Sequence, residues 1–150
     1  MTEEIANPEL RAFRDLWESK RRDGKLPARA DFGVDDFKPF MGRVAMLDVV
    51  DGGRDFRFRL YGTVIVEEYK TEMTGKLASE FRPEFVGPIM KGYKAAHDTK
   101  RPYADLIDVD APDMHYVWER VVVPLASDGE TVDMILVYSQ ELKYDWRGGS

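Results

Sequence analysis

The sequence predicts an α+β fold: short helices and one longer helix cover one face of a five-stranded antiparallel sheet, and an N-terminal amphipathic helix is added to it. Two observations predict this class. Strand-like runs come in a group of two and a later group of three, and helical patterns occupy the start of the chain and the interval between the groups. Strands joined by short turns pair antiparallel, and the intervening helices pack on the sheet. With 150 residues, 43% hydrophobic and 12% aromatic, the chain can fill one hydrophobic core.

The first element is a predicted helix over residues 8–22. Asn7 is a favourable N-cap and Pro8 suits the first helical position. The last turn is expected to be basic, with Lys20, Arg21 and Arg22. Apolar residues fall on one stripe at helical spacing: Leu10, Phe13, Leu16 and Trp17. This stripe packs either on the domain's own sheet, which is the commoner arrangement, or against a second copy of the chain.

Residues 23–37 contain several helix and strand breakers and predict a surface linker. Two strands follow, over residues 43–50 and 54–61, and the turn Asp51-Gly52-Gly53 joins them as a hairpin. Because side chains alternate along a strand, the second strand is expected to send one set to the core and the other to the opposite face. The core set is Phe56, Phe58 and Leu60, and the other set is Arg57, Arg59 and Tyr61.

The middle of the chain predicts three helices. Short ones cover residues 64–69 and 77–81, and a longer one lies within residues 83–99. The longer helix either begins at Pro88 or is kinked there, because proline has no N–H to donate. A third strand over residues 102–109 follows.

An Asp128-Gly129 pair between two apolar runs predicts the last hairpin. If Ser127 pairs with Glu130, the register on one face is as follows: Leu125 opposes Val132, Val123 opposes Met134, Val121 opposes Leu136 and Glu119 opposes Tyr138. Three apolar pairs mark this as the core face. The opposite face has an apolar middle that can receive the first helix.

The composition excludes several classes of function. A net charge of -6 argues against a dedicated nucleic-acid binder, which needs clustered Lys and Arg. Because the sequence has no cysteine, it cannot form disulfides, thiolate metal sites or a cysteinyl-flavin adduct. The start is acidic, and no run of about 18 apolar residues occurs, so we expect a cytoplasmic protein.

Short motifs connect these elements to a known family. They are Arg59-Leu60-Tyr61-Gly62-Thr63, Tyr69, Thr74-Gly75-Lys76-Leu77 and Val123-Pro124-Leu125, with the lead-in Leu26-Pro27-Ala28-Arg29-Ala30-Asp31-Phe32. In this order they resemble the uncharacterised single-domain bacterial PAS proteins over roughly residues 10–142. The resemblance implies a sensory or protein-interaction module, often dimeric, with a cavity between the sheet and its covering helices. We accordingly expect an N-terminal helix and linker (1–37), a PAS-like domain (38–142) and a C-terminal tail (143–150).

Six residues are candidates for lining such a cavity. The helical side is expected to provide Tyr69, Met90, Tyr93 and His97, and the sheet is expected to provide Glu119 and Tyr138. A buried carboxylate is costly unless it is paired. Glu119 and Tyr138 therefore either anchor a polar group of a small apolar or amphipathic ligand, or lie at the end of the sheet in solvent.

Other chemistry has weaker support in the sequence. PAS domains that carry haem hold it through a histidine on the long helix, but a lone histidine near a helix C-terminus, such as His97, is more often a cap, so the cofactor stays unknown. His115 has no carboxylate or second imidazole at ligand spacing, so no metal site is expected. The acidic residues Asp105, Asp108, Asp110 and Asp113 are expected to be solvated.

These observations favour a non-catalytic sensory module that binds a small ligand or a partner protein and acts through protein contacts. Alternatives are a ligand-free dimerisation or scaffold module, and a small cone-fold isomerase or dehydratase with Glu119 and Tyr138 as its acid and base. We expect a homodimer and an unidentified signalling partner. The residues expected to contact a partner are Leu10, Phe13, Trp17, Arg59 and Trp118.

Overall fold

The computed structural model describes residues 5–69 and 71–147, and it describes neither the side chains of residues 68 and 69 nor the predicted end of the tail at 148–150. One antiparallel sheet has the strand order β2-β1-β5-β4-β3. Its strands are β1 (Val44–Val50), β2 (Asp55–Tyr61), β3 (Tyr103–Ala111), β4 (Met114–Leu125) and β5 (Met134–Trp146). The predicted α+β class with five antiparallel strands is confirmed.

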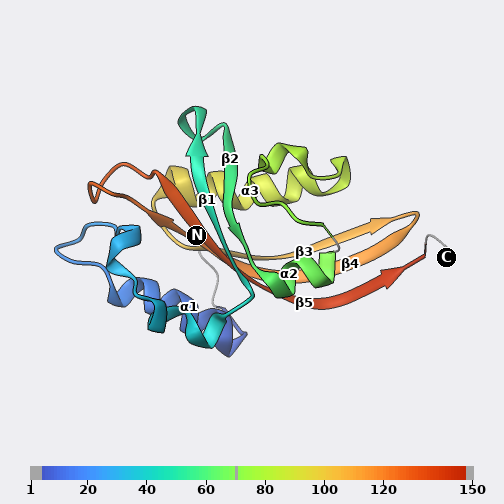
Figure 1. Ribbon diagram of the computed structural model, residues 1–150, viewed down its shortest axis with the longest axis horizontal. Coiled ribbons are helices and arrows are strands. Elements are labelled where there is room, and N and C mark those ends of the chain that lie inside the picture. Colours follow the sequence, from blue (N-terminus) through green and yellow to red (C-terminus); the bar gives the residue numbers. More distant parts are fainter. Residues whose placement is uncertain (1–4, 70, 148–150) are drawn as a thin grey trace.

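The helices lie on both sides of this sheet. They are α1 (Pro8–Ser19), α2 (Thr63–Tyr69), α3 (Pro83–Thr99) and the 3₁₀ helices η1 (Arg29–Asp31), η2 (Val34–Phe40), η3 (Asp51–Gly53) and η4 (Ala78–Glu80). Figure 1 shows α1 and the segment after it on one side of the sheet, with α3 on the other. We call these two sides the α1 face and the α3 face.

Helix α1 packs on the chain's own sheet, as its apolar stripe predicts. Asn7 caps it, because the side-chain Oδ1 accepts hydrogen bonds from the backbone N–H of Glu9 at 2.8 Å and of Leu10 at 3.3 Å. The helix ends at Ser19, so the expectation that it reaches residue 22 is wrong. Instead, Lys20 forms an ion pair with Asp36 of η2 at 3.0 Å.

The segment after α1 is more than a surface linker, which corrects the prediction for residues 23–37. It contains η1 and η2 and buries Phe32, Phe37 and Phe40. The Phe40 ring meets the edge of Phe13 at a centroid distance of 5.0 Å. These aromatic residues stand among polar ones and glycines, so no strand or helix periodicity marked them as core.

A β-bulge in β2 overturns the predicted alternation. Met46 pairs with Leu60, and the next residue, Leu47, pairs with Phe58, so Arg59 is the extra residue. After the bulge the faces exchange: Leu60 is 45% exposed and Tyr61 only 8%. Phe56, Phe58 and Tyr61 therefore form the buried set, and the placement of Leu60 in the core is wrong.

Helix α3 begins at Pro83 and continues through Pro88, so it does not start at that proline. Gly92 lies at its closest approach to the sheet. A Cβ on Gly92 would fall 2.3 Å from Nη2 of Arg120 on β4. Glycine is therefore needed here for the helix to pack over a buried arginine.

The last hairpin is confirmed, but its predicted register is wrong by two residues. Leu125 pairs with Met134, and Glu119 pairs with Gln140 instead of Tyr138. The loop is longer than a two-residue turn because the side chain of Asp128 accepts hydrogen bonds from the N–H groups of Glu130 and Thr131, at 2.8 and 2.7 Å.

The sides of β4 and β5 are opposite to those predicted. The residues expected to face the middle helices, including Val121, Val123 and Tyr138, face α1. The set expected to face α1, including Tyr116, Trp118 and Arg120, lines a cavity beside α3. The prediction failed because both sets are apolar and both faces are buried, so alternation separates the sets without saying which helix covers each.

Candidate functional site

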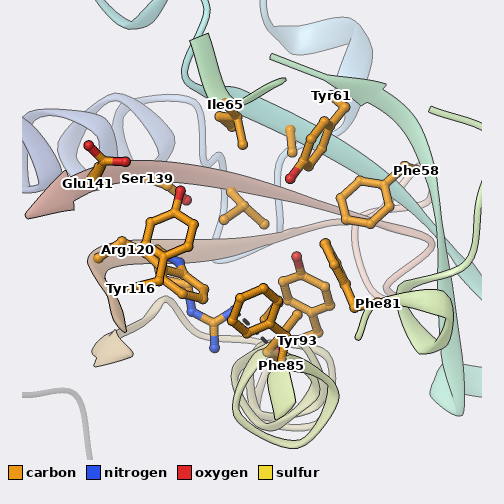
Figure 2. A pocket seen from close by; sticks show the side chains of 14 residues that line it. Phe58, Tyr61, Ile65, Phe81, Phe85, Tyr93, Tyr116, Arg120, Ser139 and Glu141 are labelled. Atoms are coloured by element: carbon orange, nitrogen blue, oxygen red, sulfur yellow. Dashed lines mark hydrogen bonds between the residues drawn. The ribbon is translucent and has the colours of Figure 1, made fainter. Parts of the chain in front are cut away.

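A cavity lies between the sheet and α3 (Figure 2). Its volume is about 50 Å³. It is lined by Ala45, Phe58, Tyr61, Ile65, Phe81, Phe85, Ile89, Tyr93, Tyr116, Trp118, Arg120, Val137, Ser139 and Glu141. At roughly 10–15 Å³ for each water, the cavity has room for about four waters or a few ligand atoms without movement of its walls.

Aromatic side chains make up half of the lining residues. Phe58 meets Tyr61 and Phe81 edge to face, with ring centroids 5.1 and 5.6 Å apart. On the other side, Phe85 meets Trp118 at 5.7 Å, with an angle of 87° between the rings. Edge-to-face packing holds these rings at fixed angles. The cavity therefore has an apolar lining with a defined shape.

Arg120 is the one buried charged side chain among the described residues, at 1% exposure. Its Nε donates to Oδ1 of Asp105 on β3 at 2.8 Å, and its Nη2 donates to Oδ2 at 3.3 Å. Nη1 donates to the carbonyl of Ile89 at 3.1 Å, and Nη2 also donates to that of Pro88 at 3.0 Å. Arg120 thus joins β4, β3 and α3 at the cavity wall.

Tyr93 of α3 lies beside Arg120, whose Cζ is 5.3 Å from the centre of the phenol ring. The residue is 4% exposed. Figure 2 shows its hydroxyl pointing into the cavity. Burial raises the pKa of Tyr93 to about 12, so the phenol keeps its proton at neutral pH.

Four lining residues are only half-buried and mark where the cavity meets solvent. They are Ile65, Trp118, Ser139 and Glu141. Ile65 belongs to α2, and the other three belong to β4 and β5. A ligand too large for the cavity would extend between α2 and these two strands.

Comparison with protein families identifies the domain type. A profile of the PAS domain family matches residues 5–137. The chain belongs to the PAS domain family. Comparison with curated proteins gave no match.

Solved structures agree on the fold of this PAS domain. A sensory box sensor histidine kinase from Vibrio cholerae superimposes with a TM-score of 0.51 at 13% identity, over 67% of this chain and 82% of the other. A fungal LOV domain photoreceptor superimposes with a TM-score of 0.50 at 11% identity, over 85% of this chain and 88% of the other. Identities this low support the shared fold alone.

The PAS domain brings only part of the predicted ligand-binding set together. Tyr93 lines the cavity. Met90 is buried in α3 but is not among the lining residues. The side chain of Tyr69 lies outside the described part of the structure. His97 lies against Gly53 and the edge of Phe56, and its Nδ1 is 2.8 Å from Asp98.

Glu119 and Tyr138 are on the α1 face, so their predicted position beside Tyr93 is wrong. Tyr138 stacks on Phe13 at 5.4 Å, and its hydroxyl accepts a hydrogen bond from Gln140 at 2.8 Å. Glu119 accepts a hydrogen bond from the side chain of Asn7. Both residues help to close α1 onto the sheet.

Haem does not fit this arrangement. His97 is not among the residues that line the cavity, and its ring is bonded to Asp98. A cavity of about 50 Å³ is also far smaller than the several hundred Å³ of a typical cofactor site. Within residues 5–69 and 71–147, no group of three or more His, Asp or Glu side chains is placed to hold a metal ion.

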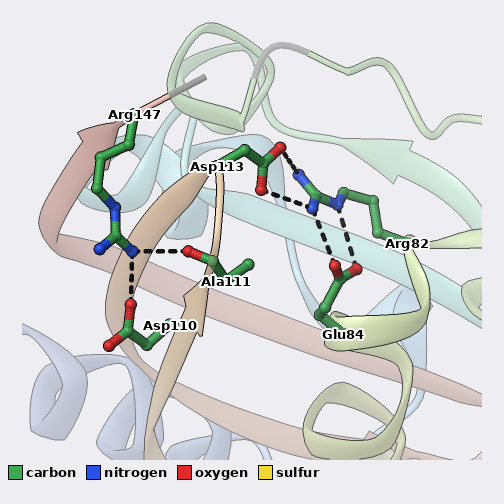
Figure 3. A network of polar contacts seen from close by, with 6 residues as sticks. All are labelled: Arg82, Glu84, Asp110, Ala111, Asp113 and Arg147. Atoms are coloured by element: carbon green, nitrogen blue, oxygen red, sulfur yellow. Dashed lines mark hydrogen bonds and ion pairs between the residues drawn. The ribbon is translucent and has the colours of Figure 1, made fainter. Parts of the chain in front are cut away.

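The acidic residues of β3 and the turn after it form ion pairs, which corrects the expectation that they are simply solvated. Asp105 pairs with Arg120, Asp108 with His115 at 2.7 Å, Asp110 with Arg147 and Asp113 with Arg82 at 2.9 Å. His115 therefore does have a carboxylate neighbour. Figure 3 shows that Arg82 also binds Glu84, and that Arg147 donates to the carbonyl of Ala111.

These pairs tie three parts of the PAS domain together. Arg82 precedes α3, Asp113 lies in the β3–β4 turn, and Arg147 follows β5. The Arg82 guanidinium holds the pKa of Asp113 below its usual range, and Arg147 does the same for Asp110. The start of α3 is thus connected to the end of the last strand through the turn.

The sequence reasoning missed Arg120 and Trp118 as parts of the cavity wall, and Asp105 as the partner of Arg120. One signal was present: Arg120 is the only charged residue among the alternate positions Tyr116, Trp118, Arg120, Val122 and Pro124, which share one face of the strand. An arginine on such a face needs a buried partner, and the acidic residues of the adjacent strand supply one. Gly92 in the middle of a helix was a second signal, because glycine there usually marks a close approach.

No helix in the described part of the chain is long and apolar enough to cross a membrane.

Proposed function

We propose that this PAS domain is a non-catalytic, cytoplasmic sensory module that binds a small ligand in the cavity on the α3 face and signals through contact with another protein. One observation carries the proposal. The buried residues Arg120 and Tyr93 bring polar groups to a cavity whose other lining is mainly aromatic and aliphatic. Apolar walls with a few fixed polar groups are typical of small-molecule sites.

The chemistry of the cavity supports binding more than catalysis. Arg120 is engaged by Asp105, and the phenol of Tyr93, with a pKa raised to about 12, does not act as a base at neutral pH. The two residues considered as an acid and base pair, Glu119 and Tyr138, lie on the other face. General-base catalysis at neutral pH needs a group whose pKa lies at about 7. Glu141, at the mouth of the cavity, is the only carboxylate among the described lining residues.

A groove at the edge of the sheet supports a contact with a partner protein, for which we propose a second copy of the chain. Its lining includes Val34, Met41 and Leu60, which are all exposed. Arg59, predicted as a partner residue, is exposed beside Leu60 and pairs with Asp48 at 3.0 Å. Exposed apolar side chains gathered around one groove are typical of interaction surfaces.

The other predicted partner residues are less suited to that role. Leu10, Phe13 and Trp17 are buried by the chain's own sheet, and Trp118 lines the cavity. They can contact a partner only if α1 leaves the sheet or the cavity opens. The proposed contact therefore rests on the groove and Arg59.

Native mass spectrometry tests the sensory proposal. Protein purified without refolding is measured directly and after incubation with the small-molecule fraction of a cell extract. We expect wild type to carry an added mass, and Ser139→Leu, which fills the mouth of the cavity, to lose it. Lys143→Leu places the same side chain at an exposed site on the same strand and should retain the mass.

A wild-type mass equal to the polypeptide alone under both conditions would contradict ligand binding. The same spectra report the oligomeric state, and Met41→Asp should convert a dimer to a monomer by placing a charge in the groove. A dimer that persists in this variant would exclude the groove as the contact.

A further inference from the structure

Two hydrogen-bond donors at the cavity have no partner among the described residues. The first is the hydroxyl of Tyr93, a side chain that is 4% exposed and that points into the cavity (Figure 2). The second is one N–H of Arg120. Its Nε–H, both Nη2–H groups and one Nη1–H are used by Asp105 and by the carbonyls of Pro88 and Ile89, which leaves the other Nη1–H. Among the described residues no fully buried side-chain N or O atom lacks a partner, so the Tyr93 hydroxyl is accessible from the cavity. It can therefore donate to a molecule bound there.

The charges around these donors favour a ligand with no net charge. Asp105 already balances the charge of Arg120 through two hydrogen bonds. An anionic ligand would add an unbalanced negative charge to a buried site that also has Glu141 at its mouth. A cationic ligand would have to lie near the Arg120 guanidinium. A neutral ligand avoids both penalties.

The aromatic walls of the cavity favour a ligand that contains a planar ring. Phe58 packs edge to face against Phe81, and Phe85 packs edge to face against Trp118, so these rings are held at fixed angles. A flat ring fits between such side chains in offset or edge-to-face contact. Because the closed cavity measures about 50 Å³, a ring larger than a few atoms extends past Ile65 toward the mouth.

Resting on the proposed sensory function, we propose that the cavity binds a small neutral cyclic or aromatic carbonyl compound whose oxygen accepts a hydrogen bond from the hydroxyl of Tyr93. The unused N–H of Arg120 is a second donor for the same ligand or for a water bound with it. Asp105 holds Arg120 in place and keeps the site neutral. The ligand class thus follows from one unpartnered phenol, one balanced charge and an aromatic wall.

Three probes of similar shape test this class: acetophenone, α-methylstyrene, in which a methylene group replaces the carbonyl oxygen, and benzoate. Dissociation constants are measured by ligand-observed NMR titration. A net hydrogen bond of about 0.5–1.5 kcal/mol corresponds to roughly 2- to 10-fold in affinity. We expect wild type to bind acetophenone more tightly than α-methylstyrene by that factor, and to bind benzoate more weakly than either.

Two tyrosine variants locate the donor. Tyr93→Phe should remove the preference for acetophenone over α-methylstyrene and still fold, since its hydroxyl has no partner to lose among the described residues. Tyr138→Phe, the matched variant on the α1 face, should keep the preference. Equal binding of the two neutral probes to wild type, tighter binding of benzoate, an unchanged preference in Tyr93→Phe or no binding of any probe would each overturn the inference.

The same titrations separate this inference from the proposed function. If α-methylstyrene or benzoate binds as well as acetophenone and Ser139→Leu abolishes that binding, the cavity is a ligand site and only the carbonyl class is wrong. If no probe binds and native mass spectrometry also finds no added mass, both fail.

Discussion

The two faces of the sheet are both covered by a helix, yet they are packed in different ways. On the α1 face, Trp17 donates its indole N–H to the carbonyl of Pro124 at 2.7 Å, and Phe13 and Phe40 enclose Tyr138. On the α3 face, Arg120 of β4 donates hydrogen bonds to backbone carbonyls of the helix, and a cavity remains beside it. The first face is built for stability, and the second combines packing with an accessible site.

Two tyrosines illustrate the difference. Tyr138 is stacked, and its hydroxyl is hydrogen-bonded to Gln140. Tyr93 is equally buried, but its hydroxyl has no partner in the described part of the protein. No fully buried side-chain N or O atom of the described residues lacks a partner, so the Tyr93 hydroxyl is accessible from the cavity. Tyr138 is therefore a structural tyrosine, and Tyr93 is a candidate ligand contact.

The largest effect is expected on the α1 face. Trp17→Ala should lower the free energy of unfolding by about 3–5 kcal/mol, because it leaves a large cavity and an unpaired carbonyl at Pro124. Urea denaturation measures this loss. Trp146→Ala, at a site that is 52% exposed, is the control and should change stability by less than about 0.5 kcal/mol. A similar loss for both variants would contradict the tight packing of α1.

The next effect concerns the ion pair on the α3 face. Asp105→Asn keeps the shape of the side chain but leaves the Arg120 charge buried without a balancing carboxylate, which should cost about 3 kcal/mol. Asp108→Asn, on the same strand but exposed, should cost far less. Urea denaturation of both variants measures the contrast. Equal stabilities would show that Asp105 does not balance Arg120 in the folded protein.

Two glycines of α3 give a smaller contrast of opposite sign. Gly87→Ala adds a methyl group in open space and should stabilise the helix by about 0.5–1 kcal/mol. Gly92→Ala brings a Cβ to 2.3 Å from Arg120 Nη2 and should destabilise by about 1–2 kcal/mol, because the guanidinium cannot move without losing its bonds. Thermal unfolding followed by circular dichroism measures both. A stabilising Gly92→Ala would mean that Arg120 is free to shift.

The smallest stability effects distinguish the tyrosines. Tyr138→Phe loses its hydrogen bond with Gln140 and should cost about 0.5–1.5 kcal/mol. Tyr93→Phe loses no partner within the described part of the chain and should leave stability within about 0.5 kcal/mol of wild type. The two variants are compared by urea denaturation in the absence of any ligand. A large loss for Tyr93→Phe would reveal a structural bond that the proposed ligand contact excludes.

Local patterns predicted much of the fold. The Asn7 cap, the alternating strand before Gly62 and the Asp128-Gly129 turn each marked an element that the structure contains. The bulge at Arg59 could not be foreseen, because it depends on how β2 pairs with β1 and not on its own sequence. The register of the last hairpin depended on the side chain of Asp128, which lengthens the loop.

The site was harder to predict than the fold. Tyr93, which was expected to bind a ligand, lines the cavity, because helical spacing puts it on the buried side of α3. Glu119 and Tyr138 were assigned to the same cavity because alternation groups residues into faces but does not say which helix covers each one. Arg120 and Asp105 come from neighbouring strands, so their pairing follows only from the tertiary structure.

The most direct test of the two-face account uses xenon, which enters apolar cavities without needing any particular hydrogen bond. Methyl-labelled protein is examined by NMR under xenon pressure, with Ile65, Ile89 and Val137 reporting on the α3 face and Leu10 and Val123 on the α1 face. The account predicts saturable shifts at the first three methyl-bearing residues and none at the other two. Equal shifts on both faces, or shifts at Leu10 and Val123 alone, would contradict it.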